Sequence, residues 1–167
     1  MKIEIVKVGY LETNCYILSK ENKVLVIDPG DEIDKIKKVI NKKKVVGCIV
    51  THNHFDHIGA LSYFDKVYDY NNLSEGINNI DEFKFEVIYT PGHTSDSICI
   101  YFKEEKLMFT GDFIFKEGLG RTDLGGNDLD MVNSIKKISS YPNVKIYPGH
   151  GDSSYLQDEL QKIRQYY

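Results

Sequence analysis

Cysteine is scarce in this 167-residue chain, and the three that occur, Cys15, Cys48 and Cys99, are far apart and odd in number. That pattern excludes both a disulfide framework and a paired-thiolate zinc site, so any metal chemistry has to use other side chains. Cys48 and Cys99 lie in apolar, strand-like runs, where we expect buried thiols.

Long hydrophobic runs and an excess of positive charge are also missing. No apolar stretch approaches the ~18 residues of a membrane span, and the alternating start at residues 1–5 has no signal-peptide core. We therefore expect a cytoplasmic protein with no membrane partner. The formal net charge is −4, so the basic run at residues 42–44 predicts a solvated helix end, and we expect no nucleic-acid partner. The sequence carries no signal of the oligomeric state.

The chain contains no linker or low-complexity tract, so we predict that residues 1–167 form a single domain. Apolar alternation or continuous apolar runs predict strands at residues 3–8, 15–18, 24–27, 45–50, 66–70, 84–89, 98–102, 106–109 and 144–147. A long glycine-rich loop is expected at residues 111–126.

Helical periodicity appears in three places. Residues 32–41 predict a helix with Asp31 as its N-cap, and residues 128–139 predict a second helix. A final helix is opened by the capping-box pattern Ser154-x-x-Gln157 and carries one apolar stripe: Leu156, Leu160, Ile163 and Tyr167. Two sheets packed face to face, with these helices outside, would bury the apolar runs.

All five histidines sit where a predicted strand ends in a turn that contains glycine or aspartate. The densest group is Thr51-His52-Asn53-His54-Phe55-Asp56-His57, with four ligand-type side chains in six residues. His52 and His54 are two residues apart and therefore point to the same side of an extended segment. A chance cluster of solvated turn residues is improbable at this density, so the segment predicts a metal site.

Three further candidates, His93, Asp112 and His150, each follow an apolar strand and adjoin a glycine. Alone, such a turn is most often structural. Together with residues 52–57, the three make seven imidazole and carboxylate ligands without a thiolate. Seven exceeds the four ligands of a closed structural zinc site, and the donor set suits Zn²⁺, Fe²⁺ or Mn²⁺ in a catalytic site. Two metals sharing one carboxylate is the economical arrangement.

These residues together resemble the metallo-β-lactamase superfamily over nearly the whole chain. Several motifs look like its short glyoxalase II-like (hydroxyacylglutathione hydrolase-like) branch: Thr90-Pro91-Gly92-His93-Thr94, Gly111-Asp112, Gly120-Arg121-Thr122-Asp123, Thr13-Asn14-Cys15-Tyr16 and Asp28-Pro29-Gly30. The resemblance implies an α/β (α+β) fold, a four-layer αββα sandwich of two mixed β-sheets flanked by helices, with metals at one edge of the sheets.

The resemblance also divides the ligands between two divalent ions, with Zn²⁺ favoured and Fe²⁺ or Mn²⁺ compatible. The division is His52, His54 and His93 for one ion, Asp56, His57 and His150 for the other, and Asp112 bridging. Asp28 would support the cluster from behind, although a plain turn aspartate before Pro29 fits the sequence equally well.

The implied activity is thioester hydrolysis by a metal-bound bridging hydroxide that Asp56, as a catalytic residue, orients. Persulfide dioxygenases look similar around the same motifs but hold one iron, here through His52, His93 and Asp112. Phosphodiesterase or nuclease activity is disfavoured by the net charge. β-Lactamases usually lack the Asp-His pair in this form and are exported, and a non-enzymatic metal-binding protein would not need seven ligands.

Three departures from the branch leave the substrate open. Glutathione-binding members carry an added C-terminal helical region, whereas one helix is predicted here after His150. Asp96 stands where the branch usually has glycine, and residues 124–127 lack the tyrosine that contacts glutathione. Arg121 is the candidate for binding an anionic group. The expected partner is a small-molecule thioester.

Overall fold

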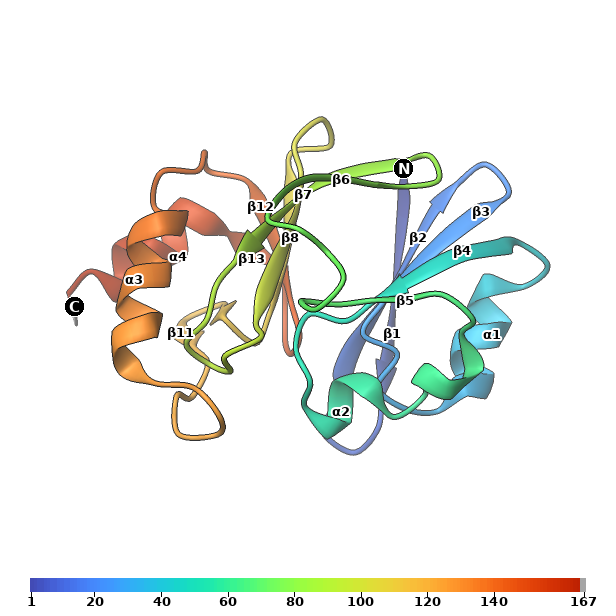
Figure 1. The fold of residues 1–167 in the computed structure, drawn as a ribbon, viewed down its shortest axis with the longest axis horizontal. Coiled ribbons are helices and arrows are strands. Elements are labelled where there is room, and N and C mark those ends of the chain that lie inside the picture. The colour runs from blue at the N-terminus through green and yellow to red at the C-terminus, as the bar shows by residue number, and fades with distance from the viewer. Residues whose placement is uncertain (166–167) are drawn as a thin grey trace.

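A computed structural model describes residues 1–165 of the chain. Two β-sheets face each other across a shared core, and helices cover their outer faces (Figure 1). The predicted four-layer αββα sandwich is therefore confirmed. Within residues 1–165, no helix combines the length and the apolar character needed to cross a membrane.

The first sheet contains five strands in sequence order: β1 (Lys2–Val8), β2 (Thr13–Lys20), β3 (Lys23–Ile27), β4 (Lys44–Ile49) and β5 (Val67–Tyr68). β1, β2 and β3 pair antiparallel, whereas β3, β4 and β5 run parallel. Helix α1 (Ile33–Ile40) makes the crossover from β3 to β4. The parallel pair brings the C-terminal ends of β3 and β4 to the same edge of the sheet.

The second sheet has six strands in the order β13 (Ser154–Tyr155), β12 (Lys145–Pro148), β9 (Leu107–Gly111), β8 (Ile98–Phe102), β7 (Phe83–Tyr89) and β6 (Gly76–Ile80). β9 and β12 pair parallel, and β8 runs antiparallel between β7 and β9. β7, β9 and β12 thus point in one direction, and their C-terminal ends share one edge.

The remaining elements lie in the connections and on the second sheet. They are α2 (Phe55–Ile58), a 3₁₀ turn (Leu61–Tyr63), the small hairpin β10 (Ile114–Phe115) and β11 (Gly118–Leu119), α3 (Asp128–Ile138) and α4 (Leu156–Ile163). The segment 111–126, predicted as a glycine-rich loop, therefore contains a short β-hairpin. β10 and β11 are only two residues long, too short to leave an alternation pattern in the sequence.

Three apolar layers hold the sandwich together. The central layer lies between the sheets and includes Phe83, Phe102 and Phe109, all essentially without solvent exposure. α1 packs on the first sheet through Ile36, while α3 and α4 pack on the second, with Met131 among their contacts. All three cysteines are buried and unpaired, as expected for Cys48 and Cys99.

Two of the predicted helix starts are wrong. Glu32, not Asp31, precedes α1 in a left-handed conformation with φ 46°, and its side chain caps nothing. The Glu32 carboxylate instead accepts a hydrogen bond from the backbone N–H of Gly9 at 2.9 Å and pairs with Lys35 at 2.6 Å. Contacts with the β1–β2 turn therefore override the local capping signal.

The capping box predicted for the last helix does not form. Ser154 lies in β13 beside β12, and the helix begins two residues later, at Leu156. The Gln157 amide donates hydrogen bonds to the carbonyls of Ser139 and Tyr141 instead. Strand pairing thus keeps Ser154 extended. Leu156, Leu160 and Ile163 are buried as one stripe, and Tyr167 lies outside the described residues.

Candidate metal centre

The candidate centre lies where the strand ends of both sheets converge. His52 and His54 follow β4, and Asp56 and His57 belong to α2. From the second sheet, one side chain follows each of the co-directional strands β7, β9 and β12: His93, Asp112 and His150. The structure brings all seven side chains singled out in the sequence together at this edge.

Asp112 lies at the middle of the group. Its Oδ2 is 3.3 Å from His150 Nε2, 3.6 Å from His93 Nε2 and 3.8 Å from His52 Nε2. Its Oδ1 is 3.3 Å from His57 Nε2. The Asp112 carboxylate therefore faces imidazoles on both of its oxygens, as a bridging ligand requires.

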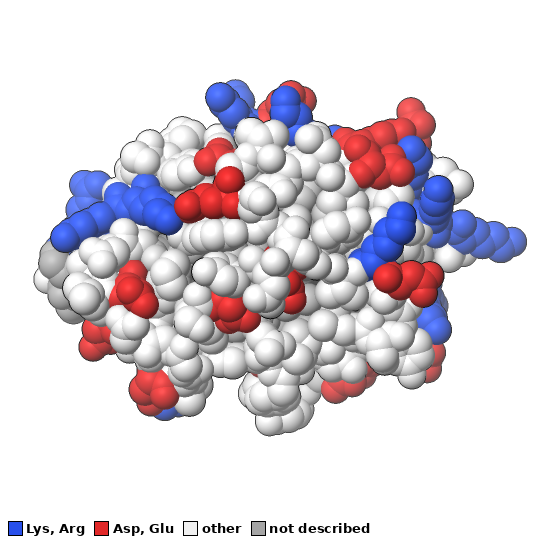
Figure 2. All heavy atoms as spheres, in the orientation of Figure 1, with Lys and Arg blue, Asp and Glu red and all other residues white. Residues whose placement is uncertain are grey.

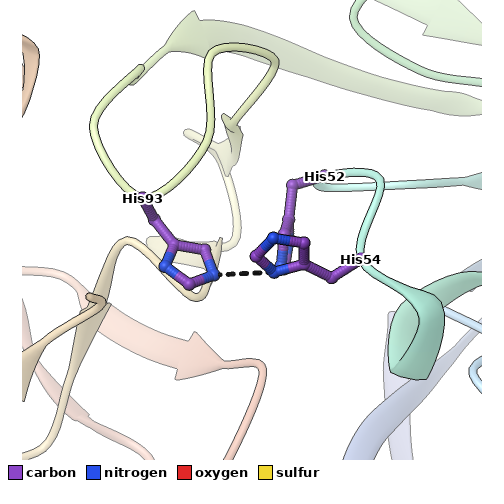
Figure 3. A group of neighbouring side chains, drawn as sticks. All are labelled: His52, His54 and His93. Atoms are coloured by element: carbon purple, nitrogen blue, oxygen red, sulfur yellow. Dashed lines mark hydrogen bonds between the residues drawn. The ribbon is translucent and has the colours of Figure 1, made fainter. Parts of the chain in front are cut away.

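The other ligand atoms form two sets on either side of Asp112. His52, His54 and His93 make one set, and Figure 3 shows their imidazoles turned toward one another, with 3.0 Å between His54 Nδ1 and His93 Nε2. The other set contains Asp56, His57 and His150, with Asp56 Oδ2 lying 3.1 Å from His150 Nε2 and 3.3 Å from His57 Nε2. Within each set, all ligand atoms lie within 4.8 Å of one another.

Three buried polar atoms in the described chain point into this group without a hydrogen-bond partner: His52 Nε2, His57 Nε2 and Asp112 Oδ1. Leaving such an atom unpaired in the interior costs about 1–3 kcal/mol. Three converging polar atoms without hydrogen-bond partners therefore argue against a purely structural cluster. A cation among them would satisfy all three, so the residues fit a metal ion.

The outward nitrogen of every histidine is anchored. The anchors are Thr51 Oγ1 for His52 at 3.1 Å, the Leu124 carbonyl for His54 at 2.9 Å, Asp28 Oδ2 for His57 at 2.9 Å, the Arg121 carbonyl for His93 at 2.6 Å and the Leu11 carbonyl for His150 at 3.1 Å. An acceptor on the outer nitrogen holds an N–H there, so the inner nitrogen is the one that a metal can take. His54 presents Nδ1 to the group, and the other four present Nε2.

Burial and charge set the protonation of the group. Burial lowers the pKa of His52 well below its ordinary value, which keeps that imidazole neutral. Burial alone would raise the pKa of Asp112, but the imidazoles of His150 and His57 outweigh it and hold that pKa well below its usual range. Burial would lower the pKa of His150, yet Asp112 and Asp56 raise it to about 9. The ionised carboxylates thus create a site that attracts cations.

Asp28 lies behind the cluster at the end of β3 and not in an exposed turn. It is buried and adopts a left-handed φ of 53°. Its Oδ1 accepts the Thr51 backbone N–H at 2.8 Å, and its Oδ2 accepts the Thr51 hydroxyl at 2.7 Å as well as His57 Nδ1. Asp28 therefore orients both His57 and the start of the ligand-bearing segment.

Sequence reasoning assigned no role to Thr13, Asn14 or Tyr16, although it noted their motif. The Thr13 hydroxyl donates to Asp56 Oδ2 at 2.8 Å. The Asn14 amide donates to the carbonyls of Pro148 and Gly151, and the Tyr16 hydroxyl donates to the Pro148 carbonyl at 2.5 Å. The motif therefore clamps the turn that carries His150.

Arg121 lies at the rim of the centre, but its guanidinium is engaged. Its Nε and Nη2 donate to the two carboxylate oxygens of Asp123 at 2.9 and 2.7 Å. The Arg121 side chain is 70% exposed. It lines a pocket of about 740 Å³ that opens onto the metal ligands. The predicted anion-binding residue is thus placed beside the site and already holds a carboxylate of its own chain.

Comparison with known proteins adds independent information. The sequence profile described as "Metallo-beta-lactamase superfamily" matches residues 8–78 and 72–150. The probable metallo-hydrolase YqgX of Bacillus subtilis (strain 168) is 32% identical, over 90% of this chain and 90% of its own length. The hydroxyacylglutathione hydrolase GloC of Haemophilus influenzae is 29% identical, over 95% of each chain. The crystal structure of TTHA1623 in a di-iron-bound form has a TM-score of 0.85 at 27% identity and covers 95% of this chain and 98% of that chain.

Proposed function

Because this chain belongs to the metallo-β-lactamase superfamily and is a metallo-hydrolase of that superfamily, we propose that it is a thioester hydrolase of the glyoxalase II (hydroxyacylglutathione hydrolase) type. The observation that carries the proposal is the double ligand set around Asp112, with its three unpartnered atoms. The similarity to a hydroxyacylglutathione hydrolase supports the thioester as the bond that is cleaved.

The residues would hold two divalent ions, with Zn²⁺ as the first candidate and Fe²⁺ or Mn²⁺ as alternatives. One ion would take His52, His54 and His93; the other would take Asp56, His57 and His150; Asp112 would bridge them. When bound, such ions lower the pKa of a water molecule and polarise an acyl carbonyl.

The protein's own contribution is to position the reacting groups. Thr13 donates a hydrogen bond to Asp56 Oδ2 and so fixes the carboxylate that would orient the attacking water. Asp56 stays ionised: burial opposes this, but His150 and His57 hold its pKa well below the usual range. Among the described residues that line the pocket, none carries a hydroxyl or a thiol. The described pocket lining therefore offers no serine, threonine or cysteine nucleophile, and this favours direct attack by water.

A mononuclear iron persulfide dioxygenase is the second candidate. His52 Nε2 and His93 Nε2 both approach the same oxygen of Asp112, Oδ2, at 3.8 and 3.6 Å. Two histidines and one carboxylate around one point is the arrangement that non-haem iron oxygenases use. The second set, Asp56, His57 and His150, would hold no metal in that enzyme, so hydrolysis with two ions accounts for more of the observed ligand geometry.

The two candidates are separated by metal analysis of protein purified without added metal, combined with two assays. We expect close to two ions per chain and hydrolysis of thioesters from a panel that includes S-lactoylglutathione. Asp112→Ala should lose both ions and the activity, since it removes the ligand common to both sets. One iron per chain, with oxygen uptake on glutathione persulfide and no thioester hydrolysis, would establish the dioxygenase instead. Full metal content and activity in Asp112→Ala would exclude the bridging role.

A further inference from the structure

The pocket in front of the candidate metal centre has mainly apolar walls. Its apolar lining includes Leu11, in the β1–β2 turn, and Phe55, in α2, from the first half of the chain. From the second half it includes Phe115, Leu119 and Leu124. Phe55 is 63% exposed and Leu124 is 49% exposed. Large apolar side chains left open to solvent around a concave site mark a surface that contacts a ligand.

These walls adjoin the metal ligands themselves. The Phe115 ring lies 6.2 Å from the His150 ring, and the Leu124 carbonyl accepts the hydrogen bond from His54 Nε2. Apolar groups therefore flank both ligand sets. A thioester with its carbonyl at the metal centre has to place its acyl and thiol arms against these side chains.

The pocket offers little positive charge to the acyl and thiol arms of a substrate. Among the described residues that line the pocket, Arg121 is the only lysine or arginine, and its Nε and Nη2 are both hydrogen-bonded to Asp123. Lys116, on the neighbouring hairpin, lies 3.4 Å from Asp152. Figure 2 shows few basic atoms along the lower border of the molecule, the border at which α2 lies in Figure 1. A carboxylate on a substrate arm thus meets no unpaired lysine or arginine among the described lining residues.

From this geometry we propose that the preferred substrates are thioesters with uncharged, apolar arms, and that Asp123 strengthens this preference by pairing with the Arg121 guanidinium. The inference rests on the proposed thioesterase function and narrows its substrate class. Glutathione, with two carboxylates and one ammonium, is the wrong carrier for such a pocket. Because the Arg121–Asp123 pair is exposed, the pairing is weak, so Asp123 lowers the attraction of Arg121 for anions by about 1.4- to 5-fold and does not abolish it.

Binding of two thioethers to the metal-loaded protein tests the preference without hydrolysis. S-hexyl-N-acetylcysteamine and S-hexylglutathione share the hexyl chain and differ in the charge of the carrier. We expect the neutral thioether to bind tighter to the unaltered protein. Asp123→Asn should shift the ratio of the two dissociation constants toward S-hexylglutathione by about 1.4- to 5-fold, because the freed guanidinium can pair with a carboxylate.

The matched control is Asp152→Asn, which makes the same charge change at the Lys116 pair outside the pocket and should leave the ratio where it is. Equal or tighter binding of S-hexylglutathione by the unaltered protein, or an Asp123→Asn ratio that does not move, would overturn the inference.

Hydrolysis assays then separate this inference from the function on which it rests. If S-lactoylglutathione is cleaved with a higher kcat/KM than S-lactoyl-N-acetylcysteamine, the proposed function stands and the carrier preference fails. If no thioester is cleaved but the neutral thioether binds preferentially, the thioesterase proposal fails and the pocket's preference stands.

Discussion

Each imidazole of the candidate centre is held at its outer nitrogen by a defined acceptor. Four of the anchors are remote in sequence, such as Leu124 for His54 and Leu11 for His150. Thr51, the anchor of His52, is itself held by Asp28. These contacts select the tautomer and the ring orientation, so the ligands are positioned before a metal arrives. At the scale of the residue, metal affinity therefore depends on backbone carbonyls and side chains that never touch the metal.

Asp28→Asn should lower metal affinity by about 10- to 100-fold. An asparagine offers one acceptor oxygen where three donors now converge, so His57 or Thr51 loses its anchor. Competition with a chromogenic chelator measures the change. Asp31→Asn is the control, because that exposed carboxylate accepts only the backbone N–H of Glu32. Equal affinities in the two variants would refute the supporting role of Asp28.

Gly149→Ala should impair the candidate centre because the backbone at Gly149 lies too close to two ligand side chains to leave room for a Cβ. A Cβ at Gly149 would lie 2.1 Å from Asp112 Oδ1 and 2.7 Å from His57 Cε1, so the carboxylate or the turn has to move. We expect bound metal to fall below two ions per chain while the far-ultraviolet circular dichroism is retained. Gly118→Ala is the matched control, since its added Cβ would meet nothing within 4 Å. Unchanged metal content in Gly149→Ala would contradict the close packing seen here.

At the scale of the element, the last helix is tied down by one buried carboxylate. Glu159 of α4 has no exposed side-chain surface, and it accepts hydrogen bonds from the Ser154 hydroxyl at 2.5 Å and from the Glu117 backbone N–H at 2.7 Å. It therefore connects α4, β13 and the β10–β11 turn. Burial alone would raise the pKa of Glu159, but these donors and Lys162 outweigh it and lower the pKa.

Glu159→Gln should destabilise the protein by ~1–3 kcal/mol at neutral pH, because it removes the charge that accepts hydrogen bonds from Ser154, the Glu117 backbone N–H and Lys162. A carboxyl whose pKa is lower in the folded state contributes stability above its unfolded pKa and loses it as pH falls through the folded pKa. The difference between the two proteins should thus be constant at neutral pH and shrink in acid. Urea unfolding between pH 3 and 7 measures it, with Asp158→Asn as the exposed control. A difference that grows in acid would reverse the sign and exclude this account.

At the scale of the whole molecule, the candidate centre joins the two halves of the sandwich. His52, His54, Asp56 and His57 come from the first-sheet side, whereas His93, Asp112 and His150 come from the second sheet. Each proposed ion takes ligands from both halves. Metal binding should therefore stabilise the packing of one sheet on the other, in addition to the apolar layer between them.

Removing the metals should lower the melting temperature. An ion that binds only the folded protein adds about 2.7 kcal/mol at a free concentration of 100 times its Kd, which is about 5–11 °C for a chain of this size. Calorimetry with and without EDTA gives the shift. Asp112→Ala should show a much smaller EDTA effect because its ligand sets are incomplete. A melting temperature of the unaltered protein that EDTA leaves unchanged would argue against folded-state metal binding.

Local signals were sufficient for the features that depend on near neighbours. Continuous apolar runs predicted strands such as β4 and β8, because both faces of those strands are buried. Local signals failed where a strand depends on its pairing partner. β6 has weak apolar alternation, so the sequence did not predict it, and it forms because it pairs with β7. The capping signals at Asp31 and Ser154 failed for the same reason, since a distant turn and a strand partner compete for those residues.

By itself, the sequence determined which seven side chains could bind metal, because ligand chemistry belongs to the residue type and because each lies in a segment that follows a strand. Only the tertiary structure decided how they are used. Which nitrogen of His54 faces inward, why Thr13 matters to Asp56, and which partner Arg121 takes all depend on contacts that local patterns do not encode. The amide of Asn14, for example, holds the Pro148 carbonyl across 134 positions of the chain. Such contacts form only when the two sheets have packed and their edges have met.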